Sequence, residues 1–145
     1  MSALTCRPAL IGDAAEIHEL LLRIADQIPL AVETLAQEEA LYAAVRKILA
    51  VGQSWVALGG ERIAGVALVD SAEVGRHWGE NELLNLRYAA GDGIDALIGK
   101  VLERRVPIAA TVRDANRSGL TALLERLGFQ EAEPRVGERR FRHEP

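Results

Sequence analysis

The stretch from Gly91 to Ala96, GDGIDA, carries residue types that can hold a phosphate group. Its two glycines and its alanine stand at the spacing G-x-G-x-x-G/A, at which a tight turn leads into a helix whose first amides face an anion. Asp114 follows about twenty residues later, the separation at which a carboxylate binds a ribose in dinucleotide-binding proteins. The stretch could therefore bind a pyrophosphate, or it could be a glycine-rich turn that merely begins a helix.

A dinucleotide-binding fold would need several parallel strand–helix units around this turn. The sequence predicts one such crossover, from a strand at 81–90 through a helix at 91–105 to a strand at 108–112. Before it, apolar runs at 55–58 and 63–69 flank the turn GGER and predict an antiparallel hairpin. A nicotinamide or flavin enzyme is therefore the weaker interpretation.

The rest of the chain predicts helices on both sides of this sheet. Asp13 is the expected N-cap of the first helix, and Ile28-Pro29 is expected to break it. The further predicted elements are a strand ending at Pro8, helices over 12–27 and 35–52, and a closing hairpin of 129–135 with 138–144. This order predicts a mixed α/β sheet with helices on both faces.

A late strand–turn–helix unit, TVRDANRSGLTALLERLGFQ at 111–130, is the most regular pattern in the chain. Leucines recur in it at helical spacing, and either Asn116 or Ser118 can cap the start of the helix. Gly128 is the expected left-handed residue that ends it. The leucines are Leu120, Leu123, Leu124 and Leu127.

Composition limits the classes of function. The 145 residues have a net charge of −4 and predict one domain over 1–145. The sequence has no broad basic face for a nucleic acid and no apolar run long enough for a bilayer. Cys6 is the only cysteine, so a structural thiol is expected and a zinc cluster is not. A cytoplasmic protein without a metal is the expectation.

The whole chain resembles the GNAT superfamily of acetyl-CoA-dependent N-acetyltransferases. CRPALIGDAAEIHELL is similar to the opening strand and helix, SWVALGGERIAGVALV to the second and third strands, and ENELLNLRYA to the fourth. GIDALIGKVLE is similar to the pyrophosphate-binding helix, and the strand–Asn–helix–Gly-Phe order of 111–129 is the most specific match. The resemblance implies a mostly antiparallel sheet whose parallel fourth and fifth strands splay apart.

The resemblance also implies how acetyl-CoA, as co-substrate, would bind. Main-chain groups of Leu86, Arg87 and Tyr88 would pair with the pantetheine arm, beside a bulge. Amides around Gly91, Gly93 and Ile94 would hold the pyrophosphate at the start of the helix. Asn116 would lie near the pantetheine at the mouth of the next helix.

The resemblance also implies the catalytic assignment of Glu82, whereas His77 is suggested by its place in a loop near the expected cleft. Glu82, on the fourth strand, stands where many relatives place the carboxylate that draws a proton from the amine. His77 is a second candidate base, in a loop with Trp78, which would line an acceptor pocket or cover the sheet. The usual tyrosine acid of the last helix is replaced by Leu124, which predicts core packing there.

Two carboxylates bear on the anion site. Asp92 and Asp95 flank the first helical amides, where negative charge competes with a bound pyrophosphate. The turn is also about three residues shorter than the family's usual loop. Two functions follow: an N-acetyltransferase acting on a primary amine of a small molecule or peptide, or a GNAT-like domain that has lost acetyl-CoA binding and serves as a binding or regulatory module.

Acidic residues near the expected acceptor side would suit a cationic amine, although a solvated acidic face is the simpler interpretation. A homodimer is also an open alternative, because late strands of this kind often pair across a dimer. The acidic residues are Asp26, Glu33, Glu38, Glu39 and Glu73.

Overall fold

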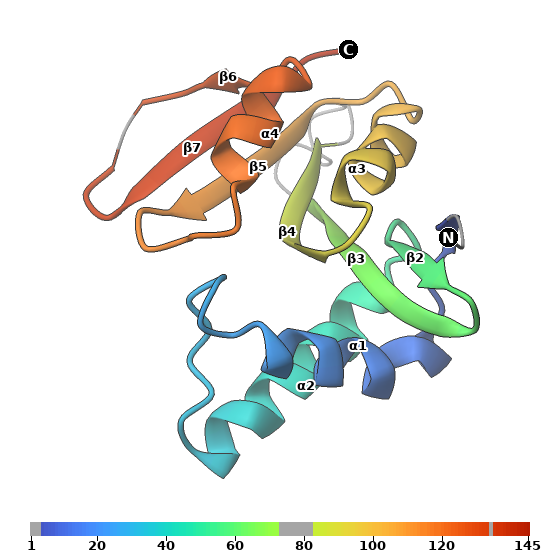
Figure 1. Cartoon of the computed structure of the whole chain (residues 1–145). Helices are drawn as coiled ribbons and strands as arrows, with labels where there is room; N and C mark the ends of the chain where they lie inside the picture. Colours follow the sequence, from blue (N-terminus) through green and yellow to red (C-terminus); the bar gives the residue numbers. More distant parts are fainter. Residues whose placement is uncertain (1–3, 73–82, 134) are drawn as a thin grey trace.

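Seven strands and four α-helices make up the fold (Figure 1), which is given by a computed structural model describing residues 4–72, 83–133 and 135–145. The elements are β1 (Thr5–Pro8), the 3₁₀ turn η1 (Ile11–Asp13), α1 (Ala14–Arg23), α2 (Leu35–Leu49), β2 (Trp55–Gly59), β3 (Arg62–Ala72), β4 (Leu83–Gly91), α3 (Ile94–Leu102), β5 (Ile108–Arg113), α4 (Leu120–Arg126), β6 (Gln130–Glu131) and β7 (Glu138–His143).

The strands form one sheet in the order β1-β2-β3-β4-β5-β7-β6. Every neighbouring pair is antiparallel except β4 and β5, which are parallel over only three residue pairs. The single parallel pair confirms the predicted mixed sheet and excludes the doubly wound fold that a dinucleotide site would need. The segment at 91–96 is therefore not a dinucleotide fingerprint in its structural context.

Hydrophobic clusters cover both faces of the sheet, as the sequence predicts. On one face, α1 and α2 pack on β2 and β3 through Ile17, Leu21 and Val45, all fully buried. On the other face, α3 and α4 pack on β4, β5 and β7 around Leu97 and Phe141. Figure 1 shows the two pairs of helices on opposite sides of the strands.

Two helix starts differ from the sequence predictions. Asp13 precedes α1, but its carboxylate does not cap that helix; it binds the Arg7 guanidinium at 2.8 and 2.9 Å and accepts the amide of Leu10. The Arg7 hydrogen bonds lower the pKa of Asp13. By contrast, α2 begins with a capping box in which Thr34 and Gln37 accept each other's backbone amides.

The late helix also begins differently. α4 is preceded by Gly119 at φ 80°, and neither Asn116 nor Ser118 caps it. Its end is as predicted, because Gly128 follows the C-cap residue Leu127 and adopts a left-handed φ of 93°. α1 ends at Arg23, before the predicted break at Ile28-Pro29, and turns fill the intervening residues. Part of the segment between α1 and α2, from Ile28 to Ala31, lines the cavity described below.

Candidate functional site

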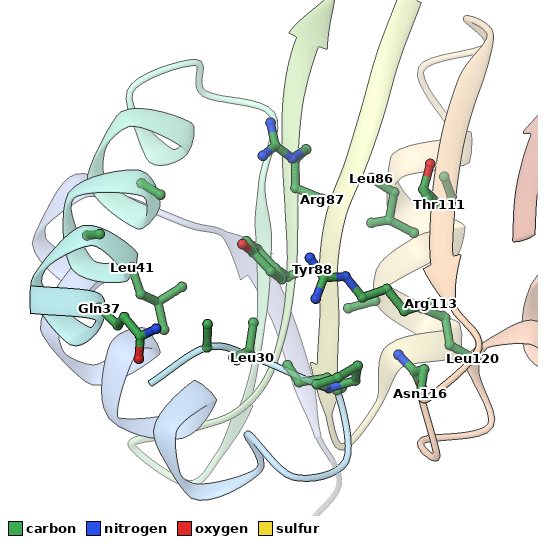
Figure 2. A pocket seen from close by; sticks show the side chains of 17 residues that line it. Leu30, Gln37, Leu41, Leu86, Arg87, Tyr88, Thr111, Arg113, Asn116 and Leu120 are labelled. Atoms are coloured by element: carbon green, nitrogen blue, oxygen red, sulfur yellow. The ribbon is translucent and has the colours of Figure 1, made fainter. Parts of the chain in front are cut away.

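A cavity of about 400 Å³ lies where β4 and β5 part. Its walls are the segment between α1 and α2, one face of α2, the two strands, and the turn before α4 (Figure 2). A volume of this size is typical of small-molecule sites. The lining residues are Ile28, Pro29, Leu30, Ala31, Gln37, Ala40, Leu41, Ala44, Leu86, Arg87, Tyr88, Ala89, Ala110, Thr111, Arg113, Asn116 and Leu120.

The opening of the sheet creates this cavity. The ladder between β4 and β5 runs from Leu84 opposite Ile108 to Leu86 opposite Ala110, and no further pair joins the two strands in the described residues. The rest of β4, through Gly91, pairs only with β3. The strands thus separate toward their carboxyl ends, as the resemblance implies, and β4 presents a main-chain edge to the gap.

A bulge in β4 lies at the point of separation. Leu68 of β3 pairs with Tyr88 and Val69 pairs with Leu86, so Arg87 is the extra residue. Leu86 belongs to the α3–α4 cluster, whereas Tyr88 packs on the α1–α2 cluster and Arg87 lines the cavity beside it. The bulge therefore brings three residues that the resemblance selects for the cofactor to one wall of the cavity.

The charge of Arg87 is partly balanced. Its guanidinium lies 2.9 Å from Oδ2 of Asp70 on the neighbouring strand β3. The second oxygen of Asp70, Oδ1, is buried and has no hydrogen-bond partner among the residues that the structure describes. Arg87 keeps half of its side-chain surface exposed, so it still presents positive charge to the cavity.

Asn116 lies at the opposite wall, in the turn between β5 and α4. The Oδ1 atom of Asn116 accepts two hydrogen bonds from Ser118, one from the backbone amide at 2.9 Å and one from the hydroxyl at 2.6 Å. This turn holds the side chain in place, and the amide nitrogen, which bonds to no residue in the described part of the chain, can donate into the cavity (Figure 2). The predicted cap is thus a positioned cavity residue instead.

Two hydrogen bonds of Arg117 connect segments that lie far apart in the sequence. The amide of Arg117 donates to the carbonyl of Gln27 at 2.8 Å, and its guanidinium donates to the carbonyl of Asp26 at 3.1 Å. These bonds join the turn before α4 to the segment after α1, on either side of the open sheet. Asp26, one of the acidic residues expected near the acceptor, also places its Oδ2 atom 3.8 Å from Nη2 of Arg117.

The glycine-rich turn lies apart from the cavity. Gly91, Gly93 and Ile94 are absent from its lining. The amide of Asp92, which the resemblance includes in the anion site, donates to the carbonyl of Ala64 at 2.8 Å. The turn is thus bonded back onto β3, and the amides available to an anion are those that open α3.

The glycines of this turn are required by its packing. Gly91 and Gly93 have φ of 86° and 74°, in the left-handed region. A Cβ at Gly91 would lie 2.3 Å from the carbonyl oxygen of Ala64, and one at Gly93 would meet Ala57 and Leu4 at 3.3 and 3.0 Å. The G-x-G spacing is therefore explained by a tight turn against β2 and β3, whether or not an anion binds there.

Several other predicted residues have defined places. Leu124 is fully buried in the α3–α4 cluster, as core packing requires, and Cys6 is half-buried against the same cluster. Asp92 and Asp95 are exposed at the start of α3. Glu82, His77 and Trp78 lie outside the described residues, so their assignments stay predictions.

Sequence reasoning did not select Gln37, Thr111 and Arg113, all of which line the cavity. In IAATVR the buried residues Ile108, Ala110 and Val112 alternate with Thr111 and Arg113. This period of two places Thr111 and Arg113 on the face away from α3 and α4. The sequence predicts the alternation along this strand, but it does not predict which face of the sheet lines a cavity.

Two classes of site are absent from the part of the chain that the structure describes. No three His, Cys, Asp or Glu side chains are grouped so that they could hold a metal ion. No described helix is long and apolar enough to cross a bilayer.

A mostly antiparallel sheet that opens between two parallel strands, beside a bulge and with helices on both faces, defines the GNAT fold. The solved structures agree. A polyamine N-acetyltransferase from Drosophila melanogaster, which forms N-acetylagmatine, is 13% identical and has a TM-score of 0.73, over 99% of this chain and 100% of that chain.

Two further structures show the same likeness. Arylalkylamine N-acetyltransferase 2 from Aedes aegypti is 12% identical, with a TM-score of 0.72 over 98% of this chain and 99% of that chain. A GNAT-family acetyltransferase from Streptococcus agalactiae is 16% identical, with a TM-score of 0.71 over 98% of this chain and 95% of that chain. No protein-family model and no curated protein sequence matches this chain. The chain therefore has the GNAT fold, which confirms the fold class that the sequence predicts.

Proposed function

We propose that this chain transfers an acetyl group from acetyl-CoA to a primary amine of a small molecule or peptide. The observation that carries the proposal is the continuous arrangement of the free β4 edge, the bulge at Arg87 and the Asn116 amide around one cavity. The edge supplies main-chain groups for an extended pantetheine arm, as an added strand would find them. The solved structures of amine acetyltransferases with the same fold support the reaction class.

Within this proposal, Leu86, Arg87 and Tyr88 hold the pantetheine arm through their main chain, and Asn116 donates to it from the facing wall. Amides at the start of α3, around Gly93 and Ile94, face the pyrophosphate, and Gly91 shapes the turn. Acetyl-CoA supplies an activated acyl group: the amine nitrogen forms a bond to the carbonyl carbon, the carbon–sulfur bond breaks, the amine loses a proton and the thiolate gains one. Glu82 stays the proposed acceptor of that proton.

The alternative is a GNAT-like domain that has lost acetyl-CoA binding and acts as a binding or regulatory module. Two observations at the expected anion site favour it: the Asp92 amide is already bonded to Ala64, and two exposed carboxylates flank the start of α3. A carboxylate at a helix N-terminus stabilises the helix alone and repels an anion. The position of the usual tyrosine acid is also filled by the buried Leu124.

Calorimetric titration of acetyl-CoA separates the two functions. The wild-type chain is compared with Asp92→Asn/Asp95→Asn and with Glu61→Gln/Glu133→Gln, which removes the same two negative charges from exposed positions elsewhere. We expect micromolar binding by the wild type, about tenfold tighter binding by the aspartate variant, and no change in the control.

A second titration with S-acetylpantetheine isolates the gap between the strands, because this compound lacks the pyrophosphate. Binding of S-acetylpantetheine and acetyl-CoA, followed by amine-dependent release of free thiol, supports the enzyme. Wild-type protein that binds neither compound contradicts the proposed function. Recovery of acetyl-CoA binding in the aspartate variant alone would then assign the loss to the two carboxylates.

A further inference from the structure

The cavity contains a cation that is not neutralised. Arg113, the last residue of β5, is exposed and lines the cavity. Its guanidinium forms no hydrogen bond or ion pair with any residue that the structure describes. Arg87 on the facing strand differs, because Asp70 already holds it at 2.9 Å.

The direction of the side chain follows from the strand. Thr111 and Arg113 alternate with buried residues and so share the face that the cavity occupies. In Figure 2 the Arg113 side chain extends from β5 into the space between β5 and β4. Glu138 is its register partner on β7, but no ion pair joins the two. The guanidinium is therefore available to a ligand in the gap.

The charge balance of the described walls favours an anion. Arg87 and Arg113 are the only charged side chains among the lining residues, and no carboxylate is among them. Glu38 and Glu39, which could have attracted a cationic amine, instead line a separate hollow with His18 and Tyr42. An ammonium group in the cavity would be repelled by the unpaired Arg113 and find no carboxylate in the described walls, whereas a carboxylate would be attracted by Arg113 and, more weakly, by the partly balanced Arg87.

We propose that Arg113 binds a carboxylate of the acceptor, so that the acceptors of this site are amines that also carry a carboxylate. The inference rests on the proposed acetyl transfer and names its substrate class. A guanidinium presents two parallel donors that match a carboxylate, which fixes the orientation as well as the position of the bound molecule. When the carboxylate end of the acceptor is bound to Arg113, the amine at its other end is free to reach the acyl group.

Three probes of matched length test the class. γ-Aminobutyrate, butylamine and putrescine share a primary amine on a four-carbon chain and differ at the far end, which is a carboxylate, a methyl group or an ammonium. Their binding is measured by saturation-transfer NMR, without acetyl-CoA, to wild type, Arg113→Gln and Arg46→Gln. Arg46 is exposed on α2 outside the cavity, so its variant removes the same charge elsewhere.

We expect γ-aminobutyrate to bind wild type about tenfold tighter than butylamine, and putrescine to bind most weakly. Arg113→Gln should remove the advantage of the carboxylate, Arg113→Lys should retain part of it, and Arg46→Gln should change nothing. Equal binding of the three probes, or tighter binding of putrescine, overturns the inference. So does an unchanged preference in Arg113→Gln whose unfolding midpoint equals that of wild type.

Turnover measurements distinguish the acceptor from the phosphates of the co-substrate. With acetyl-CoA present and thiol release followed, Arg113→Gln should raise the KM for γ-aminobutyrate and leave the KM for acetyl-CoA unchanged. The reverse pattern would assign Arg113 to a phosphate and overturn the inference. If no probe is acetylated but the Arg113-dependent preference for a carboxylate persists in NMR, the proposed function fails and the carboxylate site stands.

Discussion

Replacing Gly65 by alanine should displace the turn that leads into α3. A Cβ at Gly65 would lie 1.8 Å from the carbonyl oxygen of Asp92, a backbone atom that no side-chain rotation can move. The turn would have to retreat by more than an ångström. That movement breaks the 2.8 Å hydrogen bond from the Asp92 amide to the carbonyl of Ala64, the residue that precedes Gly65 on β3.

The cost combines two effects. Overpacking at a well-packed site costs about 1–3 kcal/mol, and a lost backbone hydrogen bond costs about 1 kcal/mol more. We therefore expect the free energy of unfolding to fall by about 2–4 kcal/mol, which lowers the midpoint of urea unfolding by about 1–2 M at the usual slopes.

Gly99→Ala is the matched control. Gly99 lies within α3, and a Cβ there would have nothing within 4 Å, so the same substitution should stabilise the protein by about 0.5–1 kcal/mol through helix propensity. Opposite signs for the two variants in parallel urea titrations support the packing of the turn on β3. A Gly65→Ala midpoint within error of wild type would refute it.

Two further predictions concern stability. Thr34→Ala should lower the free energy of unfolding by about 1 kcal/mol, because the Thr34 hydroxyl accepts the Gln37 amide at 3.2 Å. Thr34→Ser keeps a hydroxyl and should therefore keep most of this stability. Equal urea midpoints for Thr34→Ala and wild type would contradict the prediction. Asp13→Asn should cost at most about 1 kcal/mol at pH 7, since Arg7 remains 37% exposed. Because Arg7 lowers the folded-state pKa of Asp13, this stability is present above the unfolded pKa of about 4 and is lost as the pH falls through the folded value. The difference between wild type and Asp13→Asn should therefore shrink in urea titrations below pH 4, and a constant difference down to pH 2 would contradict the ion pair.

Local pattern was sufficient for most of the fold because the two periods of the backbone are read directly from apolar spacing. The leucines after Ser118 predicted α4, and the runs around GGER predicted the β2–β3 hairpin, with strands that extend to Gly59 and Ala72. Side-chain caps were less predictable. Asp13 has the type and position of an N-cap, but Arg7 on the preceding strand binds its carboxylate, and no local pattern records that competition.

The part of the candidate site that the sequence selected is the β4 main chain together with the Asn116 side chain. Leu86, Arg87 and Tyr88 were selected as an edge for a ligand, and the bulge that the resemblance implied lies at Arg87. Arg113 was missed because it is an ordinary exposed strand residue, and Gln37 because it is a half-buried residue whose side chain serves the capping box of α2. They line one cavity only after the crossover from β4 to β5 and the packing of α2 bring them together, which is a property of the tertiary fold.

The residues that look most like a binding motif are also those that the fold itself requires. Gly91 and Gly93 must be glycine because the backbone is left-handed there and passes against β2 and β3, so their spacing is explained without a phosphate. Arg113 is the opposite case, since it caps no helix, forms no ion pair with a described residue and is not buried. A residue that contributes little to stability yet lines the cavity at an opened sheet is better evidence for a ligand than a glycine motif with a structural cause. The chemistry of this chain should therefore be tested first at Arg113 and the β4 edge.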